Sequence, residues 1–64
     1  MTTYRISVKY DDDTLRDTKY YGMTKDHANE TMEALYMDIP PLENWAGLAV
    51  ISDDDGSIYS EMEW

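Results

Sequence analysis

The strictest pattern in the chain is the alternation of apolar and polar side chains in residues 4–10, YRISVKY. A period of two is that of a β-strand, so the tyrosines, isoleucine and valine face one side while the arginine, serine and lysine face the other. A strand of this kind needs a sheet with one covered face. Turn formers follow at Asp11–Asp13, and they predict that residues 15–23 return as the second strand of a hairpin.

A helix is predicted after this hairpin. Thr24 is a good N-cap, because its hydroxyl can accept a hydrogen bond from a free backbone N–H of the first turn. Asp26 lies in that turn, where the helix dipole favours negative charge. Helical spacing then places the next apolar residues on one stripe: Ala28, Met32, Leu35, Tyr36 and Ile39. Pro40 and Pro41 end the helix.

Two further strands complete the predicted fold. The nearly continuous apolar run WAGLAVIS, residues 45–52, is typical of a central strand. Asp55-Gly56 predicts a hairpin turn, since Gly56 can take positive φ. Alternation then resumes, with Ile58, Met62 and Trp64 on one face and Tyr59, Glu61 and Glu63 on the other. We expect a single acidic α+β domain over residues 1–64, ordered β-β-α-β-β, with one helix packed on an antiparallel sheet.

The small size and the absence of cysteine limit both stability and chemistry. A domain of this length buries only about 60% of the surface that its unfolded chain exposes, and no disulfide or thiolate metal site can strengthen it. Six tyrosines, two tryptophans and five methionines must therefore supply much of the core. No apolar stretch reaches the roughly 20 residues of a membrane span, and no signal-peptide pattern begins the chain. We expect a cytoplasmic protein that does not bind a membrane.

Charge is divided unequally along the chain. The formal net charge is −9, from 14 acids and five bases. All five bases lie in the first 25 residues, whereas residues 26–64 hold ten acids and no lysine or arginine. Turn propensity explains an aspartate run such as Asp53–Asp55. It does not explain a long segment without a base, so the charge itself needs an interpretation.

The acids of this segment fall into rows. Glu30 and Glu33 share with Asp26 the side of the helix opposite the apolar stripe, and Glu61 and Glu63 project from one strand face about 6.6 Å apart. Nucleic-acid backbones present comparable rows, with one charge per about 3.4 Å of axis on each strand. One hypothesis is therefore that the chain mimics nucleic acid and occupies a groove built for it. The other is that the charge only keeps the domain in solution.

Other chemistries fit the sequence less well. An EF-hand calcium loop centred on Gly56 fails, because its end positions would be Ile51 and Met62; a cation site between Asp53 and Asp55 stays open. The chain has a single histidine, and Gly-rich phosphate loops and metal-ligand spacings are absent. We expect no enzyme activity, no cofactor and no metal.

Direct binding of nucleic acid is also disfavoured. Arg5 and Lys9 make a short basic row on the first strand, but the overall acidic field repels phosphate. We expect this pair to face carboxylates of a neighbouring strand, such as Glu61 and Glu63 if the terminal strands pair.

The YRISVKYDDD hairpin, the YYGMT that leads into one helix and the apolar strand WAGLAVIS form a layout that resembles a known group of proteins. These are the small, acidic, cysteine-free inhibitors that bacteriophages and mobile elements direct against host machinery. Anti-CRISPR proteins and phage inhibitors of uracil-DNA glycosylase or RNA polymerase are of this kind. The resemblance implies stoichiometric inhibition of a bacterial nucleic-acid-binding protein or CRISPR effector complex, whose Lys- and Arg-lined channel would receive the acidic segment.

We expect the contact surface to combine carboxylates with one aromatic anchor. These residues are Glu30, Glu33, Asp53, Asp54, Asp55, Glu61 and Glu63, with Tyr59 as the anchor. The alternative is a phage protein-interaction module that binds a host regulatory protein through a sheet face bearing Tyr20 and Tyr59. The chain is expected to be a monomer, or a homodimer joined through an edge strand.

Overall fold

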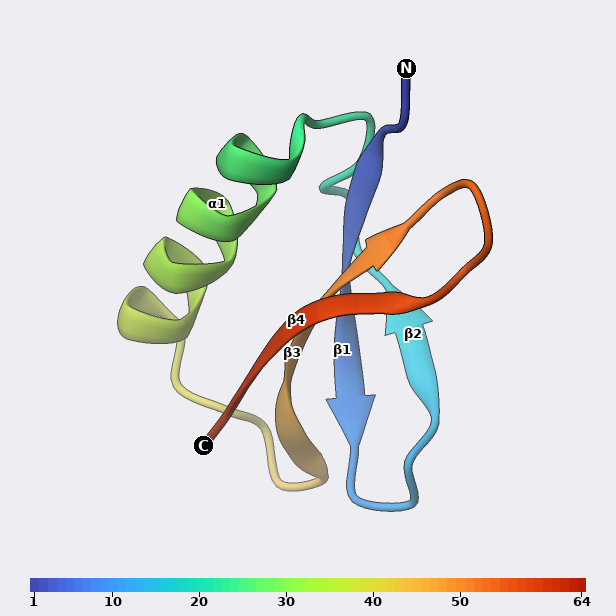
Figure 1. Cartoon of the computed structure of the whole chain (residues 1–64). Coiled ribbons are helices and arrows are strands. Elements are labelled where there is room, and N and C mark those ends of the chain that lie inside the picture. The colour runs from blue at the N-terminus through green and yellow to red at the C-terminus, as the bar shows by residue number, and fades with distance from the viewer.

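A computed structural model describes residues 1–64, which form four strands and one helix. The elements in chain order are β1 (Tyr4–Tyr10), β2 (Leu15–Asp17), α1 (Lys25–Asp38), β3 (Trp45–Ser52) and β4 (Ile58–Glu63). All neighbouring strands pair antiparallel in one sheet of order β2-β1-β3-β4, and α1 covers one face of it (Figure 1). The predicted α+β class and the order β-β-α-β-β are confirmed.

The core lies between α1 and the two central strands. It consists of Ile6 and Val8 of β1, Leu48 and Val50 of β3, and Ala28 and Met32 of α1. The buried apolar residues of β1 are the ones that its alternation assigns to the covered face, and Ser7 is buried on the other face. β3 is also buried on its other face, at Ala49 and Ile51. Burial on both faces explains why the sequence of β3 is apolar without alternation.

The helix begins and ends where the sequence predicts. The Thr24 side chain accepts a hydrogen bond from the backbone N–H of His27, as an N-cap does. Ile39 is the C-cap, in an extended conformation, because the residue before a proline avoids the α region. Ile39 thus leaves the predicted apolar stripe and is 41% exposed. The helix is too short and too polar to cross a membrane.

The second predicted strand, residues 15–23, is shorter than expected. Its first three residues form the ladder with β1, and its last residue, Met23, pairs with Tyr4 only in an isolated bridge. The backbone leaves the ladder at Thr18, whose N–H and hydroxyl both donate to the carbonyl oxygen of Ile6. Beyond this point Tyr20 packs against the core, whereas Tyr21 is 73% exposed. The two adjacent tyrosines therefore lie on different sides of an irregular segment, one toward the core and one toward solvent.

The alternation of β4 is interrupted by a bulge near its start, where the register with β3 shifts. Because of the extra residue, Tyr59 and Ser60 both turn toward the helix side of the sheet. The ring of Tyr59 lies 5.5 Å from that of Tyr4, and the Ser60 hydroxyl donates to a side chain of α1. The prediction that Tyr59 lies beside Glu61 and Glu63 is wrong for this reason.

Candidate partner-binding surface

The face of the sheet that α1 leaves uncovered holds the ion pairs of the molecule. All four join a carboxylate to Arg5 or Lys9 of β1. Beneath these side chains, Ser7, Ala49 and Ile51 are at most 1% exposed. Paired charges with long aliphatic stems therefore cover the sheet where no second layer of structure does.

Lys9 reaches two carboxylates across a neighbouring strand. Its Nζ lies 3.6 Å from Oε2 of Glu61 and 3.6 Å from Oε1 of Glu63. The terminal strands do not pair, because β3 lies between them. Gly47 stands between Lys9 and Glu63 in the register and has no side chain to block the lysine. The expected facing of Lys9 with Glu61 and Glu63 is confirmed, and Glu61 above all raises the pKa of Lys9.

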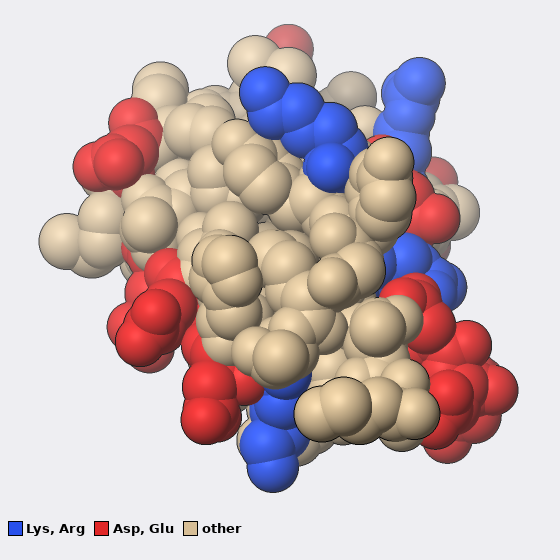
Figure 2. Space-filling view, turned by 90° about the horizontal axis from the view of Figure 1, so that it is seen from above, with Lys and Arg blue, Asp and Glu red and all other residues tan.

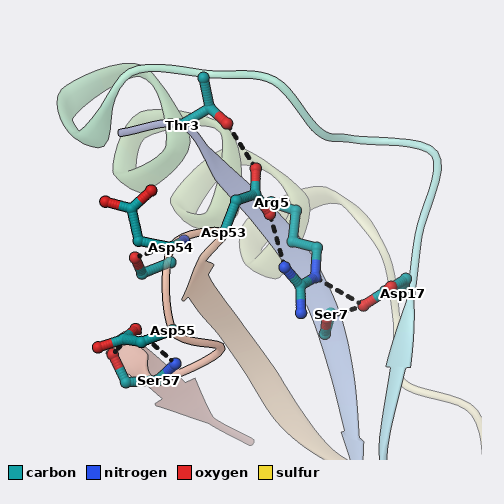
Figure 3. A network of polar contacts seen from close by, with 9 residues as sticks. Thr3, Arg5, Ser7, Asp17, Asp53, Asp54, Asp55 and Ser57 are labelled. Atoms are coloured by element: carbon teal, nitrogen blue, oxygen red, sulfur yellow. Dashed lines mark hydrogen bonds and ion pairs between the residues drawn. The ribbon is translucent and has the colours of Figure 1, made fainter. Parts of the chain in front are cut away.

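Arg5 does not face Glu61 and Glu63 as expected. It forms ion pairs with β2 and with the β3–β4 turn instead of β4. Its Nε lies 3.1 Å from Oδ1 of Asp17, and one terminal nitrogen lies 2.5 Å from Oδ1 of Asp53 (Figure 3). The Ser7 hydroxyl also donates to Asp17, at 2.7 Å, and the Thr3 hydroxyl donates to Oδ2 of Asp53, at 2.6 Å. Asp53 therefore ties the N-terminal segment to the turn rather than pointing outward.

The pKa shifts agree with this geometry. The Thr3 hydroxyl, and after it Arg5, lowers the pKa of Asp53 below its usual range. The Ser7 hydroxyl, and after it Arg5, lowers the pKa of Asp17. The hydrogen bond to Asp53 is the largest cause of the raised pKa of Arg5. Each group is thus held in its charged form by partners within the fold.

Both aspartate runs act as turns, as their composition predicts. Oδ1 of Asp55 accepts from the N–H and the hydroxyl of Ser57, and Oδ1 of Asp12 accepts in the same way from Thr14. These hydrogen bonds from the residue two positions on are Asx turns, and they lower the pKa of both carboxyls. Asp54 accepts a hydrogen bond from the Thr2 hydroxyl.

Most carboxylates nevertheless have no basic partner. Ion pairs involve only four of the 14 acids. The other ten are Asp11, Asp12, Asp13, Asp26, Glu30, Glu33, Asp38, Glu43, Asp54 and Asp55. Each of these ten is exposed. The molecule therefore presents an acidic exterior, although its most regular carboxylate row, on β4, is neutralised by Lys9.

The fold does not gather the predicted contact residues into one surface. Glu30 and Glu33 are exposed on α1, on the opposite side of the sheet from Glu61 and Glu63. Asp53–Asp55 lie at yet another place, at the end of β3. Figure 2 shows carboxylates in separate groups on two sides of a broad uncharged area. Among the predicted carboxylates without a basic partner, Asp54 and Asp55 accept hydrogen bonds within the fold, whereas Glu30 and Glu33 of the helix accept none from a side chain.

An aromatic stack at the other end of the sheet was missed by the sequence reasoning. The ring of Trp64 lies 5.4 Å from that of Tyr36 and 5.9 Å from that of Trp45, with nearly parallel planes. The Tyr36 hydroxyl donates to the carbonyl oxygen of Glu63, and the N–H of Trp64 donates to Ala46. The sequence contained a signal for this stack. Antiparallel pairing of the last two strands places Trp64, at the end of one, beside Trp45, at the start of the other.

The structure brings no group of three or more histidine, aspartate or glutamate side chains close enough to hold a metal ion. The oxygens of Asp53 and Asp55, the pair considered for calcium, face different partners within the fold.

Comparisons of the chain with protein-family models, with curated proteins and with solved structures found no match. The charge distribution and the exposed side chains are therefore the observations from which a function can be argued.

Proposed function

We propose that this protein is a stoichiometric inhibitor of the anti-CRISPR kind, which occupies the basic nucleic-acid-binding surface of a bacterial defence complex by acidic mimicry. The observation that carries the proposal is the set of ten exposed carboxylates without a basic partner. On the face of the sheet that α1 leaves uncovered, four carboxylates form ion pairs with Arg5 and Lys9 and so stabilise the fold. The carboxylates left unpaired are available to a partner, and they give the field that steers a basic surface toward the protein.

The row on α1 supports the proposal most directly. Asp26, Glu30 and Glu33 follow one another at i, i+4 and i+7, so successive positions are about 6 Å and about 4.5 Å apart along the helix axis. No lysine or arginine interrupts the row: Lys25, the nearest base in sequence, has its Nζ over the ring of Tyr59. Neighbouring like charges on a helix are unfavourable by a few tenths of a kcal/mol per pair. A basic partner would convert this repulsion into attraction.

The intramolecular contacts change the set of residues proposed to touch the partner. Asp53, Glu61 and Glu63 are held by Arg5 and Lys9, so their first role is to stabilise the fold. Glu30 and Glu33 remain as proposed contacts, and Asp26 joins them.

An interaction module that uses tyrosine is the second candidate. Tyr59 is 44% exposed, packs on Tyr4 and lies beneath Nζ of Lys25. The face differs from the expected one, because Tyr59 and Tyr20 both lie toward the helix and not on the uncovered face of the sheet.

Affinity capture separates the two candidates. The tagged protein is used to capture partners from a bacterial lysate, and excess duplex DNA is added as a competitor. Mimicry predicts a nucleic-acid-binding complex that DNA displaces. A partner that DNA does not displace would favour the tyrosine module.

Two single charge reversals locate the contact. Glu33→Lys on α1 should weaken capture of the DNA-displaced partner, since it reverses an unpaired carboxylate of the row. Asp54→Lys changes the net charge equally, but on the β3–β4 turn, and should weaken capture much less. Equal effects would show that only net charge matters and that α1 is not the contact.

A further inference from the structure

An exposed apolar surface lies at the end of the sheet where β1 ends and β3 begins, in the lower part of Figure 1. Its most exposed members are Ile39 at 41%, Leu42 at 63% and Trp64 at 37%. Ile39, Trp45 and Trp64 line one small apolar cavity of about 60 Å³, and the N–H of Trp45 donates to the carbonyl oxygen of Leu42 at 3.0 Å. These four residues, with Tyr36 in the stack, are called the tryptophan end.

Carboxylates flank the tryptophan end. Asp38 closes α1 just before Ile39, and Glu43 follows Leu42; neither has a basic partner. The last turn of α1 also lacks a base, so the negative end of the helix dipole is not offset. An apolar centre with an acidic rim is complementary to a partner that is apolar in part and positively charged.

A hollow beside this surface adds further carboxylates. It has a volume of about 400 Å³ and is lined by Tyr10, Asp11, Asp12, Thr14 and Asn44. The N–H of Asp11 donates to the carbonyl oxygen of Asn44 at 3.0 Å, which fixes the hollow next to the loop that carries Glu43. Lys9, the base of β1 at this end, already contacts two carboxylates.

We propose that the tryptophan end binds an arginine-bearing segment of the partner protein. A guanidinium group has a flat face that stacks on an aromatic ring and a planar edge that donates two hydrogen bonds to one carboxylate. The exposed part of Trp64, whose ring also stacks on Tyr36 and Trp45, supplies the aromatic contact, and the carboxylates of Asp38 and Glu43 supply the hydrogen-bond acceptors. Lysine has a compact charge without a stacking face, and it fits this combination less well. The inference rests on the proposed function, because it names the chemistry that the inhibitor would recognise.

The protein carries its own reporter for this site. Its only two tryptophans, Trp45 and Trp64, both lie in the tryptophan end. Titration of the whole chain with an oligo-arginine peptide should therefore change the intrinsic tryptophan fluorescence in a saturable way. An oligo-lysine peptide of the same length should bind more weakly. Equal affinity for both peptides would overturn the role of stacking.

A matched pair of variants tests the location. Asp38→Asn with Glu43→Gln should weaken the affinity for the arginine peptide by about tenfold or more, as expected when two charged contacts are lost. Asp54→Asn with Asp55→Asn changes the net charge equally on the β3–β4 turn, at the opposite end of β3, and should leave the fluorescence-detected affinity nearly unchanged. Equal losses from the two variants, or no fluorescence response in the unaltered protein, would overturn the inference.

The two proposals fail separately. If capture yields a DNA-displaced complex but the peptide gives no tryptophan response, the mimicry proposal stands and the tryptophan end is not the arginine site. If the peptide binds at the tryptophan end but DNA displaces no captured partner, the site stands and the mimicry proposal fails.

Discussion

Three adjacent aspartates with the same charge have three different roles in this fold. Asp53 binds Thr3 and Arg5, Asp54 accepts from the N-terminal segment, and Asp55 closes its own turn (Figure 3). The run is tolerated because hydroxyl and guanidinium donors hold the first and third carboxylates in their charged form. A sequence can show that aspartates favour a turn. It cannot show which carboxylate meets a donor about 50 residues away in the chain.

Asp53→Asn should remove a contribution to stability that depends on pH. The folded pKa of Asp53 is lowered, so its stabilising effect is complete above the unfolded pKa of about 3.9 and disappears as the pH falls through the folded value. The variant should therefore be less stable in urea than the unaltered protein near neutral pH. The difference should close in acid.

The control for this prediction is Glu33→Gln, an exposed carboxylate with no basic partner. It should not show the same loss at neutral pH. A gap between Asp53→Asn and the unaltered protein that persists below the folded pKa would mean that Asp53 acts through its shape and not through its charge.

Gly47 is the residue that lets β3 and β4 approach and lets Lys9 cross β3. A Cβ at this position would collide with the carbonyl oxygen of Met62 and come within 3.0 Å of Cα of Glu63. Both are backbone atoms, which cannot swing away as a side chain does. Gly47→Ala should therefore lower the free energy of unfolding by about 1–3 kcal/mol, the usual cost of overpacking. Unchanged urea unfolding would contradict the close approach of the two strands.

At the scale of elements, β1, α1 and β3 could be predicted, because each has a strong local signal. Period two, an N-cap with a proline stop, and a continuous apolar run depend only on neighbours in the chain. The irregular parts could not be predicted in the same way. The break at Thr18 depends on the carbonyl oxygen of Ile6, and the bulge that turns Tyr59 depends on the register with β3. Such features are set by the partner strand and not by local sequence.

The helix should become more stable when its acidic row is interrupted. Glu30→Lys would place a base four residues after Asp26 and three before Glu33, which replaces two repulsive neighbours by two attractive ones. Each such change is small, so the gain should be about 0.5–1 kcal/mol in the free energy of unfolding. The same variant should bind the captured partner less well. Chemical unfolding measures the first effect, and a loss of stability would contradict the unpaired state of this row.

Glu30→Gln is the matched control for this change. It removes the repulsion without adding attraction, so its gain should be about half as large. Carboxylates that repel one another in the free protein and attract a basic partner are what a binding role of α1 requires.

At the scale of the whole molecule, charge that is separated along the chain is mixed in space. The bases of β1 meet acids from β2, β4 and the β3–β4 turn, so the segment without bases is partly neutralised. Period-two alternation predicted that Lys9 would face Glu61 and Glu63. It did not predict the ion pair between Arg5 and Asp53, because that contact depends on the order of the strands in the sheet. The candidate surface therefore moves from the last strand to α1 and the tryptophan end.

The salt dependence of the dissociation constant for the captured partner decides whether this protein mimics nucleic acid. Mimicry of nucleic acid predicts that affinity falls steeply as salt rises, because exposed charges are screened within about 10 Å at 0.1 M salt. Glu33→Lys should make that fall shallower. An affinity that stays constant from low salt upward would contradict mimicry, since the unpaired carboxylates would then contribute nothing to binding.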